Sequence, residues 1–345
     1  TVYGTHEDGC GYQTVLSQYS FVLGLEDLSG LEASEQQAQV KAQALSEAQQ
    51  GFDLSSDLML RAKLLKLSET EHIVLVTMHH IASDGWSMSV LVNEFSEFYR
   101  AGVAGDVAQL PALQVQYSDY ARWQRNWLQG EVLNGQLAYW QDALADLPVV
   151  HSVPLDYPRP REQSFVGATV QRQLSVERSS QLKRLCQAQG ATLFMGLHAA
   201  FSVLLARYSN EHDIVVGSPI ANREQSEVSG LIGFFVNTLV LRSDVSGNPG
   251  FAQLIGQSKR QLLDAYAHQQ VPFEKLVEVL QPERSQSHHA LFQIMLVLQN
   301  NEEGVLELPG LTLSALAPEE PVAKYDLTLA VSETAQGLQL DFNYN

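Results

Sequence analysis

Two adjacent histidines, His79 and His80, are followed by Asp84, four residues beyond the second histidine, and then by Gly85. Imidazole titrates near neutral pH, so a histidine in such a setting can accept a substrate proton or position a nucleophile. Asp84 can orient the loop through a buried ion pair, and a glycine permits positive φ and close backbone approach. The constellation is a candidate acid–base site, although histidines on apolar strands are more often hydrogen-bonded core residues.

The segments on either side of this motif indicate how it is positioned. The run Ile73–Val76 is apolar without polar alternation, which is typical of a strand buried on both faces. Beyond Gly85, apolar residues recur at helical spacing. Successive strand side chains point to opposite faces, so only one of the two histidines can face a given cavity and the other is structural. A metal site is disfavoured for the same reason, and no third ligand stands at a recognisable spacing.

Composition narrows the class of protein. At 345 residues with 45% hydrophobic content, the chain can form two domains. A net charge of −18 disfavours nucleic acid and anionic membranes as partners. Cys10 and Cys186 form no Cys-x-x-Cys pair, so neither a disulfide framework nor a zinc site is indicated, and a reducing cytoplasm fits. No apolar stretch reaches membrane-spanning length, and no signal-peptide pattern opens the chain.

The order of patterns predicts a mixed α/β chain in two lobes. Prolines concentrate between Leu147 and Arg161, and each restricts its neighbour to extended geometry. We therefore place a linker at 148–164, between an N-terminal lobe at 1–147 and a C-terminal lobe at 165–345. Both ends of the sequence have strand-like patterns that stop abruptly, so we expect a fragment, incomplete at the start of the first lobe and at the end of the second.

Individual elements follow from periodicity and capping signals. In the first lobe we expect a hairpin turning at Asp8-Gly9, a helix opened by a Ser34/Gln37 capping box, and a second hairpin that leads to the histidines. Aromatic residues beyond the motif helix are interpreted as helix packing, because the acidic charge disfavours base stacking. In the second half we expect helices at 176–188, 193–208, 251–267 and 272–279, and strands at 213–216, 291–298, 325–331 and 338–344.

Several blocks, taken in order along the whole chain, resemble the condensation domains of nonribosomal peptide synthetases. Residues 79–85 match the His-His-x-x-x-Asp-Gly core of that family. Residues 117–123 look like its Tyr-x-Asp-Tyr-Ala-x-Trp motif, and residues 232–238 look like its Ile-Gly-x-Phe-Val-Asn-Thr segment. Residues 268–274 and 290–293 resemble two further blocks. The first motif is shared with other acyltransferases, whereas all the blocks in order are specific.

The resemblance implies a fold and a reaction. The fold is two chloramphenicol-acetyltransferase-like lobes, each a mixed sheet with helices, which form a V-shaped pseudo-dimer with a central tunnel. Substrates arrive as thioesters on the 4′-phosphopantetheine arms of upstream and downstream peptidyl carrier domains, beside an adenylation domain, and no cofactor is bound directly. The acceptor amine attacks the donor thioester, with His80 positioning the amine or accepting its proton and the Gly85 N–H facing the developing oxyanion.

The resemblance also implies supporting residues. His79, Asp84 and Arg223 are expected to support the site, with Arg223 across the tunnel floor and paired with Asp84. Among the remaining positions, Trp86, Ser87 and Asn237 are expected to line the substrate tunnel.

The subtype and the alternatives follow from smaller cues. The residues after Gly85 resemble domains that join an L-residue to an L-aminoacyl acceptor, and the retained histidines speak against heterocyclisation. An epimerisation domain, a stand-alone acyltransferase of the same superfamily and a catalytically silent carrier-docking domain remain alternatives. The sequences that flank the chain would discriminate among them.

Overall fold

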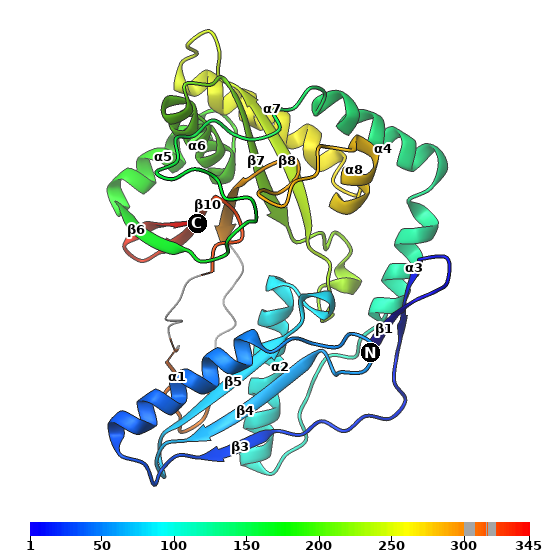
Figure 1. Ribbon diagram of the computed structural model, residues 1–345, viewed down its shortest axis with the longest axis vertical. Helices are drawn as coiled ribbons and strands as arrows, with labels where there is room; N and C mark the ends of the chain where they lie inside the picture. Colours follow the sequence, from blue (N-terminus) through cyan, green and yellow to red (C-terminus); the bar gives the residue numbers. More distant parts are fainter. Residues whose placement is uncertain (300–307, 315, 317–321) are drawn as a thin grey trace. The chain divides into compact units, whose positions relative to one another are not determined.

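The computed structural model describes residues 1–299, 308–314, 316 and 322–345, and it contains two compact units (Figure 1). Unit 1 comprises Thr1–Met88 and Ile232–Phe234, and unit 2 comprises Ser89–Leu231 and Phe235–Asn345. This division differs from the predicted lobes, because helices that follow the histidine motif contribute Tyr120 and Trp140 to the cores of unit 2.

Unit 1 is built on a three-stranded sheet in the order β3-β4-β5 (Gly24–Asp27, Leu60–Lys66 and His72–Met78). Strand β3 runs parallel to β4, and β4 pairs antiparallel with β5, which confirms the predicted hairpin. A separate hairpin, β1 (Val2–Thr5) with β2 (Gly11–Thr14), confirms the predicted turn at Asp8-Gly9. Gly9 has a φ of 84°, a conformation that glycine adopts without steric cost.

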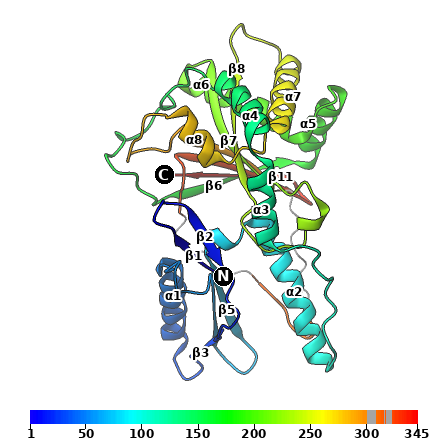
Figure 2. The ribbon, with the colours of Figure 1, turned by 90° about the vertical axis from the view of Figure 1, so that its right-hand side faces the viewer.

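Helix α1 (Ala33–Gln49) lies along the sheet of unit 1, as Figures 1 and 2 show. Its buried Val40 packs with Leu28 and Leu65, and Ile73 and Leu75 of β5 complete this core. The predicted capping box is wrong. The N-cap is Glu32, whose side chain makes no capping hydrogen bond, so Ser34 already lies inside the first turn.

Strand β5 is buried on one face only, which corrects the prediction of a strand buried on both faces. Ile73 and Leu75 pack beneath α1, whereas Val74 is 54% exposed and Val76 is 46% exposed. Alternate side chains of a strand face opposite sides, and only one side of this sheet carries α1. The unbroken apolar run of β5 therefore did not show whether one face or both faces of the strand are buried.

Unit 2 contains a six-stranded mixed sheet in the order β6-β11-β10-β9-β7-β8. Strands β10, β9 and β7 run parallel to one another, and the remaining pairs are antiparallel. The strands are β6 (Ala168–Ser175), β7 (Asp213–Ile220), β8 (Asn237–Asp244), β9 (Ile294–Gln299), β10 (Leu327–Thr334) and β11 (Gly337–Tyr344). A mixed sheet with helices is the fold class that the sequence predicted.

Strand β9 of this sheet contributes side chains to two hydrophobic cores. On one face, Ile294 and Leu296 of β9 pack with α5 (Val176–Ala188), α6 (Leu193–Ser209) and α7 (Phe251–Ala267). Met295, between them in the strand, belongs to a second core with α4 (Gly130–Ala143) and α8 (Phe273–Leu280). The strand that is buried on both faces is therefore β9 rather than β5.

The remaining helices precede the sheet in the chain. Helix α2 (Gly85–Ala104) follows the histidine motif, and α3 (Tyr117–Trp127) carries the predicted aromatic stretch. Tyr120 of α3 is buried and packs against Phe235, as predicted for a packing residue, whereas Trp123 of the same helix is 40% exposed. Short 3₁₀ turns occur at His80–Ala82 and Ser226–Val228.

One test of membrane insertion applies to the described residues. No single described helix is long and apolar enough to cross a membrane, and only α5 with α6 passes by length and composition, as a pair bent by 105°.

Candidate active site

The histidine motif begins where β5 ends. The backbone N–H of His79 still donates to the Met59 carbonyl at 3.0 Å, and the chain then turns through the 3₁₀ segment. The Nδ1 atom of His79 accepts the Ile81 N–H at 3.0 Å, and its ring meets Phe52 edge to face. Because a backbone N–H can only donate, a neutral His79 carries its proton on Nε2. His79 therefore caps the turn, and its role in supporting the site stays a prediction.

His80 has the opposite arrangement. Its Nδ1 lies 2.6 Å from the Ser83 carbonyl oxygen, which can only accept a hydrogen bond. The neutral ring must therefore carry its proton on Nδ1, and Nε2 keeps its lone pair. The residue is exposed, and no described residue forms a hydrogen bond with Nε2. The Nε2 atom is thus oriented as a base or hydrogen-bond acceptor toward an incoming group.

Asp84 caps the helix that follows. It is 4% exposed, and its Oδ1 accepts the Ser87 N–H at 2.8 Å and the Ser87 hydroxyl at 2.7 Å. Gly85 begins α2 and is not among the described residues with positive φ. The first N–H groups of a helix lack intrahelical acceptors, which is compatible with the oxyanion role predicted for Gly85.

Ser87 does not line a channel, contrary to the prediction. It is fully buried, and its hydroxyl contacts Asp84 and the backbone of Gly233. Asn237 is also misassigned. It is 7% exposed, its amide donates to the Gln269 and Val271 carbonyls, and its oxygen accepts two backbone N–H groups. Both side chains use their polar atoms on the protein itself, whereas Trp86 is 36% exposed and stays a candidate channel residue.

Two residues near the motif were not found by sequence reasoning. The Tyr3 hydroxyl donates to the Ile81 carbonyl at 3.3 Å and ties β1 to the turn, and burial raises the pKa of this phenol. Phe234 packs edge to face on the His80 ring, with centroids 5.1 Å apart. The motif resemblance pointed to the segment around Phe234, but its residue pattern leaves that position open.

Arg223 belongs to unit 2. Its Nη1 donates to the Val228 and Leu231 carbonyls, each at 2.7 Å, and its guanidinium lies 4.0 Å from the Phe235 ring centroid. It therefore shapes the turn just before Ile232–Phe234. Its expected pairing with Asp84 joins two units whose relative placement is not determined, so this pair stays a prediction.

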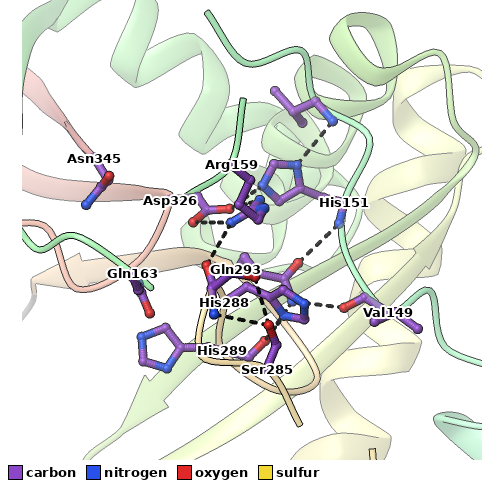
Figure 3. Close-up of polar contacts among 12 residues, drawn as sticks. Val149, His151, Arg159, Gln163, Ser285, His288, His289, Gln293, Asp326 and Asn345 are labelled. Atoms are coloured by element: carbon purple, nitrogen blue, oxygen red, sulfur yellow. Dashed lines mark hydrogen bonds and ion pairs between the residues drawn. The ribbon is translucent and has the colours of Figure 1, made fainter. Parts of the chain in front are cut away.

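A second polar cluster, the Asp326 cluster, lies in unit 2 and is drawn in Figure 3. We define it as His151, Arg159, Gln293 and Asp326. Arg159 binds both carboxylate oxygens of Asp326, and His151 Nε2 donates to the same carboxylate at 2.8 Å. The side-chain oxygen of Gln293 accepts the backbone N–H of His151 at 3.1 Å, and its amide nitrogen donates to the Val149 and His289 carbonyls. Burial alone would raise the pKa of Asp326, but the hydrogen bonds from His151 and Arg159 lower it to about 2.

The Asp326 cluster holds the predicted linker. His151 and Arg159 both lie within 148–164, and Gln163 adds hydrogen bonds to the backbone of Gln286 and Lys324. Residues 148–164, which we call the strap, are therefore attached to unit 2 through these contacts. Proline patterning identified its extended geometry but not its attachment.

A third histidine is fully buried. His198 of α6 donates from Nδ1 to Ser258, whose hydroxyl in turn donates to the Met195 carbonyl, each at 2.9 Å. Burial lowers the pKa of His198 to about 4, which keeps the ring neutral. Among the described residues, no group of three or more metal-ligating side chains converges on a point.

The comparison with known proteins decides the family. The Condensation domain family model matches residues 1–345. The chain belongs to the condensation domain family. It is 45% identical over 340 residues to a linear gramicidin synthase of Brevibacillus parabrevis, an alignment that covers 98% of this chain and 7% of that protein. The condensation domain thus spans a small fraction of the length of its curated relatives.

Solved structures agree in fold. The X-domain from teicoplanin biosynthesis superposes with a TM-score of 0.87 at 27% identity, covering 99% of this chain and 77% of that one. A four-domain nonribosomal peptide synthetase bound to AMP and glycine superposes with a TM-score of 0.84 at 27% identity, covering 100% of this chain and 27% of that one. The predicted family and mixed α/β fold are confirmed.

Proposed function

We propose that this condensation domain uses His80 to position the acceptor amine, or to accept its proton, while the amine attacks a donor thioester. One observation carries the assignment. The Ser83 carbonyl fixes the proton of the His80 ring on Nδ1, which leaves the lone pair of Nε2 on an exposed ring. His79 is a poorer candidate, because its Nδ1 is already occupied by the turn.

The chemistry requires one proton transfer. The acceptor nitrogen forms a bond to the thioester carbon, the carbon–sulfur bond breaks, and the thiolate of the donor arm leaves. The nitrogen loses a proton along this path; Nε2 of His80 takes this proton and passes it to the thiolate, or it holds the amine by a hydrogen bond while the proton moves to the sulfur. The Gly85 N–H, at the start of α2, stabilises the negative charge on the carbonyl oxygen.

The substrates and partners follow from the family context. Both substrates arrive on 4′-phosphopantetheine arms of carrier domains, with an adenylation domain in the same cytoplasmic synthetase, and both joined residues have the L configuration. The similarity to a four-domain synthetase supports this arrangement. Trp86, which is exposed beside the motif, lines the path of one substrate.

A docking function without catalysis is the second candidate. One solved relative is described as a complex of the X-domain with OxyB, so this fold also occurs as a binding partner of another protein. The open Nε2 of His80 favours catalysis in this chain.

The test uses the intact synthetase with both carriers loaded, and condensed product is measured by mass spectrometry. His80→Ala should lower the rate about 100- to 10,000-fold, which is the usual contribution of proton transfer. His79→Ala is the matched control, and after correction for the folded fraction it should turn over near the wild-type rate. Turnover of folded His80→Ala at the wild-type rate would remove the proposed role, and absence of product from the wild type would favour docking.

A further inference from the structure

The contact between His80 and Phe234 restrains a ring that one hydrogen bond cannot fix alone. A ring held only through Nδ1 can still pivot about that hydrogen bond. The Phe234 ring meets it at 89° with centroids 5.1 Å apart, the edge-to-face arrangement that aromatic rings prefer. The two contacts together define the direction in which Nε2 points.

Phe234 is itself held from the same unit. The Gly233 N–H donates to the Ser87 hydroxyl at 3.1 Å, and the Gly233 carbonyl lies 2.9 Å from that hydroxyl. The residue before Phe234 is therefore attached to Ser87 through both of its backbone polar groups. The hydroxyl proton of Ser87 is shared between this carbonyl and the Asp84 carboxylate. Because Ser87 is fully buried, water at the surface cannot take over its hydrogen bonds.

We propose that Phe234 is a positioning residue for His80 and that Ser87 anchors Phe234 through Gly233. The proposal rests on the function proposed for His80. It extends the site from the histidine motif to a segment far along the chain, since 146 positions separate Ser87 from Gly233. It also gives the buried Ser87 a role in place of the channel role predicted from sequence.

The kinetic test separates positioning from substrate binding. In the intact synthetase, Phe234→Leu removes the ring and keeps apolar bulk, so kcat for condensation should fall about tenfold while KM for the loaded acceptor carrier stays unchanged. Phe234→Tyr keeps the ring and should stay within about twofold of wild type. Wild-type kcat in Phe234→Leu, in a synthetase whose His80→Ala variant has lost turnover, or a rise in KM alone, would overturn the proposal.

A chemical labelling test reports on the contact between His80 and Phe234 and does not depend on turnover. Diethyl pyrocarbonate acylates unprotonated imidazole nitrogens, and the modified peptides of the intact synthetase are identified by mass spectrometry. In Phe234→Leu and in Ser87→Ala, labelling of His80 relative to His79 should rise about threefold or more as the ring is released. Ser96→Ala is the matched control, because its hydroxyl bonds within α2 to the Val92 carbonyl.

Labelling and turnover together distinguish the positioning role of Phe234 from the function proposed for His80. An unchanged labelling ratio in both variants would overturn the positioning role, whatever the turnover. Retained turnover in His80→Ala would instead refute the proposed function, while a raised labelling ratio would still establish that Phe234 holds the ring.

Discussion

The histidine motif of unit 1 and the Asp326 cluster of unit 2 contain the same types of residue and use them differently. In the Asp326 cluster both ring nitrogens of His151 are occupied, since Nδ1 accepts the Val153 N–H and Nε2 donates to Asp326. In the motif, His80 uses only Nδ1, and its ring is exposed. The two histidines therefore differ in the ring nitrogen that His80 leaves open, and the function proposed for His80 rests on that nitrogen.

The two carboxylates also differ. Asp326 binds a histidine and an arginine that hold residues 148–164, and Asp84 accepts two hydrogen bonds from Ser87 at the start of α2. The Asp326 cluster therefore stabilises a chain segment, and the motif presents a side chain. The following predictions test that contrast.

The largest effect is expected at Asp84. If Asp84 pairs with Arg223, Asp84→Ala and Arg223→Ala should each cost about 3–5 kcal/mol, the usual result of breaking a buried ion pair from one side. The two effects should be non-additive in a double-mutant cycle. Local opening is measured by hydrogen exchange and mass spectrometry on peptides that cover the motif in the intact synthetase. Asp84→Asn is the control, because it keeps a cap for α2 and removes the charge; additive effects would show that no such pair exists.

The next largest effect is expected at Asp326. Its carboxylate side chain is 13% exposed and receives both Arg159 and His151, so Asp326→Ala should destabilise the strap by about 3 kcal/mol. Hydrogen exchange should increase in peptides that cover 148–164. Asp213 provides the control, because it also binds an arginine through both oxygens but is 38% exposed, and Asp213→Ala should cost about 1 kcal/mol or less. Equal effects would show that burial does not separate these pairs.

Local sequence patterns predicted the helices and strands better than they predicted the contacts between residues distant in the sequence. Helix α7 begins at Phe251 and ends at Ala267 as the sequence indicated, because its apolar positions repeat with helical period. The strand, turn and helix of the motif were also predicted. The attachment of the linker was not predicted, because Arg159 and Asp326 are separated by 167 positions and the local sequence around each residue does not indicate its partner.

The misassigned residues have the same explanation. Asn237 and Ser87 lie in or beside motifs shared with the family, which suggested contact with substrate. Their partners include backbone groups far away in the sequence, at 32 and 34 positions from Asn237 and 146 positions from Ser87. A family motif locates a segment, but only the folded chain shows whether a polar side chain faces a substrate or another segment.

A smaller effect is expected from acid. The folded state lowers the pKa of Asp326 to about 2, whereas an unfolded aspartate titrates near its ordinary value of 3.8. The contribution of this carboxylate is complete above about pH 4 and is lost as the pH falls toward 2. After allowance for solvent screening of the partly exposed pair, about 1–2 kcal/mol should disappear in this window. Exchange in the strap should rise over the same pH range in the wild type and not in Asp326→Asn; parallel profiles would assign the acid sensitivity to other groups.

The smallest effect sharpens the comparison of the two histidines. His151→Gln loses the Nδ1 acceptor for Val153, while its amide can still reach the carboxylate, so the strap should lose about 1 kcal/mol. His80→Gln should change local stability by less than about 0.5 kcal/mol, because the ring is exposed and surface substitutions usually have effects of that size. Condensation should show the opposite order, since His80 has an open ring nitrogen and His151 does not. Hydrogen exchange and turnover measured on the same preparations of the intact synthetase give both comparisons. A His80→Gln variant that loses stability together with activity would mean that this ring, like His151, serves the fold before it serves the reaction.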